Sequence, residues 1–134
     1  MMSFFTPKTF LVVGGTVLLA LGILGLITWN AGVIKENSIF YLDNGENVSH
    51  IVLGAVALIL AAVLGSQQFL QKWVVVLVGI VALFFGLYGF AVSGSPMPNT
   101  FGVANLENPL DNVLHLVVGV WALVSSFMQQ AAKA

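Results

Sequence analysis

Hydrophobic residues occupy four long runs of the chain, and the few charged residues lie between these runs. The runs without Asp, Glu, Lys or Arg cover residues 9–34, 47–71, 73–106 and 112–132. Each run can contain a helix of about 20 residues, which is enough to cross a hydrocarbon core of roughly 30 Å. Turn-rich segments interrupt two of the runs. The pattern therefore predicts an all-α integral membrane protein with four transmembrane helices.

One stretch of this pattern occurs twice. Residues 46–58 read ENVSHIVLGAVAL, and residues 111–123 read DNVLHLVVGVWAL. An acid, Asn, Val, His, Gly, Ala and Leu recur in the same order in the two stretches. The stretches also contain the only two histidines of the chain, His50 and His115. The second and fourth predicted helices are therefore copies of one another.

Glycines indicate that the first and third predicted helices, residues 10–28 and 73–92, are copies as well. The matched glycines are Gly15, Gly22 and Gly25 in the first, and Gly79, Gly86 and Gly89 in the third. The chain then consists of two tandem helical hairpins, residues 9–66 and 73–131, in a single domain of residues 1–134. An even number of helices separates equivalent positions, so the hairpins share one topology. We expect a pseudo-twofold axis along the membrane normal.

Composition narrows the functional classes. The chain is 59% hydrophobic and 7% charged, which lies far outside the range of soluble domains. A net charge of −1 argues against a nucleic-acid partner, because counterion release requires clustered cations. The absence of Cys excludes disulfides, thiolate metal sites and Cys nucleophiles. The partners that remain are membrane lipid and other membrane proteins.

The charged residues are divided between the two ends of the predicted bundle. Lys8, Lys72 and Lys133 lie on the side of the termini and of the connection between the second and third helices. The other side carries Lys35 and all five acids, which are Glu36, Asp43, Glu46, Glu107 and Asp111. The positive-inside rule then predicts that both termini are cytoplasmic. We expect the protein in the bacterial inner membrane.

The second and fourth helices begin with residues that cap helices. Asp43 and Glu46 fit a capping box in which Asp replaces Ser or Thr. In the fourth helix, Asn108 is the expected N-cap, with Pro109 at the first helical position and Asp111 at the third. An acid in the first turn also interacts favourably with the helix dipole.

Other repeated residues are expected to be structural. We interpret Asn47 and Asn112 as hydrogen-bonding residues at the helix starts that fix the outer loops. Small residues mark the places where membrane helices approach closely. The glycines that we expect to pack helices are Gly15, Gly22, Gly25, Gly54, Gly79, Gly86, Gly89 and Gly119.

The two histidines are the candidate functional residues. Each shares a helix face with an acid one turn before it and a glycine one turn after it. This small-residue face should point into the bundle, and an ionisable residue at membrane depth marks a candidate site. On a structural interpretation, each histidine donates a hydrogen bond to the acid one turn earlier, Glu46 or Asp111, and accepts one from a neighbouring helix.

On a functional interpretation, His50 and His115 ligate a tetrapyrrole. Histidines at one depth on two parallel helices could supply both axial ligands of haem b, or bind two chlorophyll-type pigments separately. Gly54 and Gly119, one turn away, would leave room for the macrocycle. Apart from this alternative we expect no cofactor. We also expect no metal site, because two histidines and two acids would have to converge while the acids cap helices.

The repeated N-V-x-H-[IL]-V-[LV]-G pattern resembles an uncharacterised bacterial family of four-helix integral membrane proteins, a domain of unknown function. The pattern lies within residues 46–58 and 111–123. The resemblance implies a four-helix membrane fold and implies no activity. Its signature positions in this chain are Asn47, His50, Gly54, Asn112, His115 and Gly119.

These patterns predict a protein that is not an enzyme. The sequence contains no nucleophile–base constellation, no phosphate-binding loop and no HExxH motif. We expect a structural or accessory membrane protein that assembles with itself, as a homo-oligomer, or with a larger membrane complex. The alternative is a haem- or pigment-binding subunit, and a lesser alternative is a small transporter or channel.

Overall fold

A computed structural model describes residues 4–30, 32 and 42–131 of the chain. It contains four helices: α1 (Pro7–Asn30), α2 (Asn44–Val63), α3 (Gln68–Ala91) and α4 (Leu110–Ala131). All four are long and apolar enough to cross a membrane, and no named strand occurs among the described residues. The predicted all-α fold with four membrane-spanning helices is confirmed. Lys35, Glu36 and Lys133, used above in the charge argument, lie outside the described residues.

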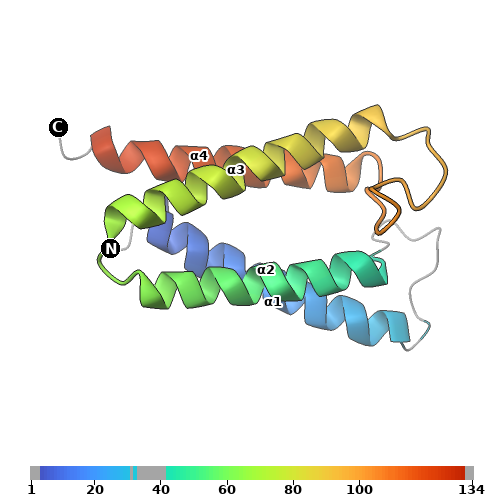
Figure 1. Cartoon of the computed structure of the whole chain (residues 1–134), viewed down its shortest axis with the longest axis horizontal. Coiled ribbons are helices and arrows are strands. Elements are labelled where there is room, and N and C mark those ends of the chain that lie inside the picture. The colour runs from blue at the N-terminus through green and yellow to red at the C-terminus, as the bar shows by residue number, and fades with distance from the viewer. Residues whose placement is uncertain (1–3, 31, 33–41, 132–134) are drawn as a thin grey trace.

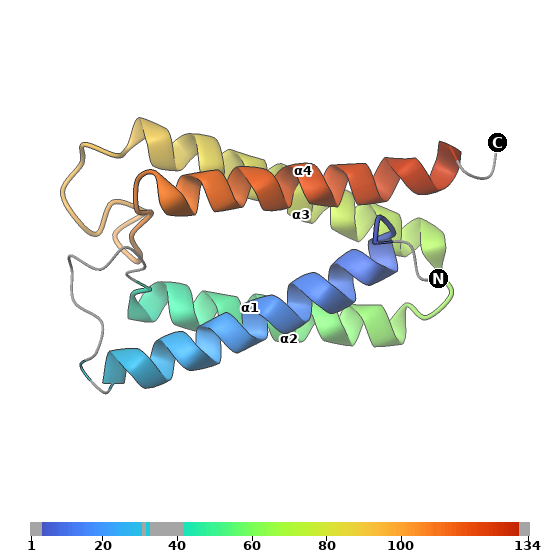
Figure 2. The same ribbon diagram turned by 180° about the vertical axis from the view of Figure 1, so that it is seen from behind.

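The helices pack as two hairpins, α1 on α2 and α3 on α4, as the duplication predicted. Figures 1 and 2 show the start of α1, the α2–α3 turn and the end of α4 at one end of the bundle, called the terminal end below. The starts of α2 and α4 lie at the opposite end, called the loop end. The candidate residues at the starts of α2 and α4 therefore share one end.

The first hairpin is held by glycines that meet at the helix crossing. A Cβ atom on Gly15 would lie 3.1 Å from the backbone oxygen of Gly54, and one on Gly54 would lie 2.6 Å from the backbone nitrogen of Leu19. No side chain fits in this space, so the α1 and α2 backbones are in direct contact. In the second hairpin, Leu83 packs against Gly119, and Leu123 packs against Gly79.

The two hairpins touch mainly through α1, which contacts both α3 and α4. Phe10 and Leu11 of α1 belong to a buried cluster with Val75 and Ala122. Trp121 packs against Phe10 with ring centroids 4.6 Å apart. The remainder of α1 diverges from the second hairpin (Figure 2), and the described part of α2 makes few direct contacts with α3 or α4. The hairpins are thus tight internally and loosely joined to each other.

The start of the third helix differs from the sequence-based prediction. We expected the third helix to begin at Trp73, whereas α3 begins at Gln68 and contains Lys72. The Lys72 ammonium lies 5.5 Å from the ring centroid of Trp73 and 4.8 Å from that of Phe127. These cation–π contacts, together with the reach of a lysine side chain toward the interface, allow a charge inside the first turns of a membrane helix.

Candidate functional site

The loop end begins with the cap of α2. The Oδ1 atom of Asp43 accepts a hydrogen bond from the Glu46 backbone (2.9 Å), and the Asp43 backbone donates to Oε2 of Glu46 (3.1 Å). This is the capping box that the sequence indicates. The second carboxylate oxygen of Asp43 accepts a hydrogen bond from the Asn105 backbone at 2.7 Å. The residue that starts α2 therefore also ties the first hairpin to the α3–α4 loop.

The start of α4 is arranged differently. Oδ2 of Asp111 accepts a hydrogen bond from the Glu107 backbone at 3.0 Å. The Asn108 oxygen accepts from the side chain of Asn112 at 3.3 Å, where the sequence suggested a first-turn backbone amide as its partner. The helix itself begins at Leu110, so Pro109 precedes it. The polar residues of this turn bind one another more than they cap the helix.

Asn47 and Asn112 are completely buried, and each faces a glycine of the partner helix. A Cβ atom on Gly25 would overlap the Oδ1 atom of Asn47, and a Cβ atom on Gly89 would overlap the Oδ1 atom of Asn112. Neither oxygen has a conventional hydrogen-bond donor among the described residues. Contacts of this kind between a carbonyl oxygen and a backbone Cα–H group recur at helix–helix interfaces. Each repeated asparagine therefore donates a hydrogen bond at its helix start and packs its oxygen against a glycine of the partner helix.

Three carboxylates from the two hairpins converge at this end. Ligand atoms of Glu46, Glu107 and Asp111 all lie within 4.8 Å of one another. Glu46 and Asp111 are buried, and Glu107 is half-buried. Oxygen ligands in such a group suit a hard divalent cation, and shared protons would equally offset the carboxylate charge. Sequence spacing missed this cluster, because Glu107 lies in a loop whose path the helix pattern does not define.

The two histidines have unequal surroundings. Nδ1 of His115 lies 2.7 Å from the backbone oxygen of Asp111, which can only accept, so Nδ1 is the donor. The expected partner was the Asp111 carboxylate, which is bound to the Glu107 backbone instead. Nδ1 of His50 is buried and has no hydrogen-bond partner among the described residues. His50 lies within electrostatic reach of His115 and Asp111, so the repeat brings both histidines into one region.

The face beside the histidines is open. Leu53 and Val118 lie one helical turn further from the loop end than His50 and His115, at matching places in the repeat. Their side chains are 57% and 37% exposed. We expected Gly54 and Gly119 to leave room here for a macrocycle. In the structure they contact the Leu19 and Leu83 backbones within their own hairpins, so their space is already filled.

Comparisons with protein-family models, curated proteins and solved structures found no match to this chain. The resemblance to a bacterial four-helix family therefore stays a prediction that rests on the repeated motif. The functional argument below rests on the site alone.

Proposed function

We propose that this protein is a non-enzymatic structural or accessory protein of the bacterial inner membrane, with both termini cytoplasmic. It assembles with copies of itself or with a larger membrane complex through the open face beside the histidines. The repeated asparagines and glycines hold each hairpin together, and the acids organise the loop end. Most polar side chains that could take part in a reaction therefore have a structural role instead.

The exposure of Leu53 and Val118 beside the histidines is the observation that carries this proposal. Both residues lie on the sides of α2 and α4 that carry His50 and His115, and the described part of the chain leaves them uncovered. A half-buried histidine at membrane depth is unfavourable against lipid alone. A helix from a second protein would cover the two histidines and contact Leu53 and Val118. Histidine side chains are among those that hydrogen-bond across helices in membranes.

Site-specific photo-crosslinking tests this assembly. A photoreactive residue at Leu53 should crosslink to protein in native membranes, and mass spectrometry then separates a second copy from a different partner. Ile59 is the matched control, because it is 59% exposed on another face of the same helix. We expect protein adducts from position 53 and lipid adducts alone from position 59. Lipid adducts alone from both positions, with a monomeric protein after gentle extraction, would contradict the proposal.

The geometry of His115 favours a second candidate, a haem- or pigment-binding subunit. Because Nδ1 donates to the Asp111 carbonyl, Nε2 is left as the ring's acceptor, and this arrangement is common in metal-ligating histidines. His115 is half-buried, so part of this residue is accessible. The filled space around Gly54 and Gly119 weighs against a macrocycle seated between the helices.

An absorption spectrum of protein gently purified from its native membrane separates the two candidates. A bound haem gives a Soret band and visible bands that shift on adding dithionite, and a pigment gives its own band. Replacing His115→Ala should abolish either signal if this histidine is a ligand. A spectrum with only aromatic absorbance, before and after dithionite, would eliminate the second candidate.

A further inference from the structure

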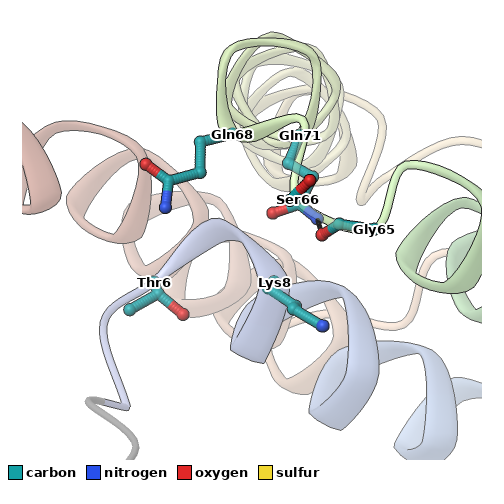
Figure 3. Close-up of a pocket in the computed structure, with 6 residues that line it drawn as sticks. All are labelled: Thr6, Lys8, Gly65, Ser66, Gln68 and Gln71. Carbon is teal, nitrogen blue, oxygen red and sulfur yellow. Dashed lines mark hydrogen bonds between the residues drawn. The ribbon is translucent and has the colours of Figure 1, made fainter.

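A pocket of about 350 Å³ lies at the terminal end, remote from the histidines and acids. It lies between the start of α1, the α2–α3 turn and the first turns of α3 (Figure 3). Its lining residues are Thr6, Lys8, Gly65, Ser66, Gln68 and Gln71. The volume is in the lower part of the range of small-molecule sites. Because two helices that are long enough to cross a membrane begin here, we expect the pocket to lie at the level of the lipid headgroups.

Most of the described lining residues have polar side chains, and the one charge among them is positive. Lys8 is the single charged residue, and the other side chains offer hydroxyl and amide groups. Gln71 is 2% exposed, and its Nε2 atom donates to the Gly65 backbone oxygen at 2.8 Å, which holds the turn against α3. Gly65 has a φ of +48°, a conformation that favours glycine, so the turn that carries Ser66 has a defined shape.

Polar side chains surround the lysine, and hydrogen bonds hold some of them in place. Thr6 accepts a hydrogen bond from the Thr9 backbone at 3.1 Å, and its side chain is thereby held at the start of α1. Figure 3 shows the Gln68 side chain extending from α3 toward the start of α1, with Lys8 across from Ser66. The backbone amide of Gln68 donates to the Ser66 backbone oxygen at 2.8 Å, which fixes the turn that carries the Ser66 side chain.

The charge distribution of the molecule favours an anion here. The described acids, Asp43, Glu46, Glu107 and Asp111, all lie at the loop end, separated from the pocket by the length of the helices. Lys72 adds a second cation at the terminal end, outside the pocket lining. An anion in the pocket therefore meets attraction from Lys8 and Lys72 and is remote from every described acid.

We propose that this pocket binds the phosphate group of an anionic ligand at the membrane surface. Lys8 pairs with the negative charge, and the Ser66 hydroxyl donates a hydrogen bond to a phosphate oxygen. The phosphate belongs either to an anionic phospholipid headgroup or to a soluble phosphate compound. This site is independent of the assembly proposed above, since it lies at the other end of the bundle.

Native mass spectrometry of the detergent-purified protein measures the binding directly. The probes are phosphatidylglycerol and phosphatidylcholine added separately, and inorganic phosphate added alone and in competition. Lys8→Gln should weaken phosphatidylglycerol binding by more than about tenfold, because a charge-assisted hydrogen bond is lost. Lys72→Gln is the matched control, with the same charge change at the same end. It should weaken binding by no more than about fivefold, the general contribution of one lysine near a membrane.

The binding measurements distinguish a lipid headgroup from a soluble phosphate compound as the ligand. Strong phosphatidylglycerol binding that resists inorganic phosphate identifies a lipid headgroup, and Lys8-dependent binding of inorganic phosphate alone identifies a soluble ligand. Equal losses in the two lysine variants would overturn the proposal, since the effect would then be general surface charge. Equal binding of the two lipids, with no binding of inorganic phosphate, would also overturn it. Ser66→Ala, in an exposed turn, provides a second variant that should weaken binding without changing the net charge.

Discussion

At the scale of single residues, one contact is used twice. The oxygen of Asn47 lies against Gly25, and the oxygen of Asn112 lies against Gly89. Both asparagines are fully buried in a segment where an unpaired polar group is costly. The Asn47 amide donates to the Leu42 backbone at 3.0 Å, so one half of the side chain fixes the entry to α2 while the other half fits the glycine.

Substitution of Gly25 tests this contact, and another glycine of the same helix provides a control. In Gly25→Ala the new methyl group would overlap the Asn47 oxygen, so the first hairpin must separate or the asparagine must move. We expect a loss of about 1–3 kcal/mol of unfolding free energy, the usual cost of overpacking. The measurement is reversible unfolding in mild detergent, followed by circular dichroism.

Gly14→Ala is the matched control, in the same helix. A Cβ atom there would meet only the Trp121 ring, at 3.8 Å, which is an ordinary contact. We expect a change close to zero or a gain of about 0.4–1 kcal/mol from the less flexible unfolded chain. Equal destabilisation by both substitutions would show that any added methyl group disrupts α1, and that the asparagine contact is not special.

At the scale of elements, hydrophobic runs and capping residues were sufficient to predict the four helices and the box at Asp43. Hydrophobic runs and capping residues are local properties of the chain, so they can be recognised in the sequence. The start of α3 was missed because Lys72 is accommodated by rings of Trp73 and Phe127, and the second of these belongs to another helix. The approach of Glu107 to Glu46 was also missed because it is a contact between distant parts of the chain. It depends on the path of the α3–α4 loop toward the first hairpin.

Asp43 connects two elements, and its two oxygens can be tested separately. In Asp43→Asn, one side-chain oxygen can still accept from the Glu46 backbone, but an amide NH₂ would then face the Asn105 backbone donor. The helix cap is retained and the tie to the α3–α4 loop is lost. In Asp43→Ala both are lost, and cap removal alone costs about 0.5–2 kcal/mol.

We therefore expect graded effects from this pair, with Asp43→Ala less stable than Asp43→Asn and both less stable than the original protein. Limited proteolysis of the α3–α4 loop provides the second measurement. Cleavage should increase in both variants, because both lose the Asn105 contact. An Asp43→Asn protein with unchanged stability and unchanged cleavage would show that the tie contributes nothing to the loop end.

At the scale of the whole molecule, the two ends of the bundle are chemically different. Lys8 and Lys72 lie at the terminal end, and the described acids lie at the loop end. The hairpins are joined at both ends of the bundle. At the terminal end they are joined through α1, and at the loop end through the hydrogen bond between Asp43 and Asn105. The two hairpins contact each other least in the middle of the bundle. The proposed partner would bind there.

This polarity predicts an orientation, and the absence of cysteine from the sequence makes it measurable. Single cysteines can be introduced at two exposed serines, Ser66 in the α2–α3 turn and Ser95 in the α3–α4 loop. If the lysine-bearing end is cytoplasmic, as the positive-inside rule requires, a membrane-impermeant maleimide should label Ser95→Cys in intact spheroplasts. Ser66→Cys should be labelled only after the membrane is opened. The reverse pattern would place the acids in the cytoplasm, and the lysines would then have no part in setting the topology. Labelling of both positions in intact cells would instead indicate that the chain inserts in two orientations, in which case its weak excess of lysine is insufficient to select one.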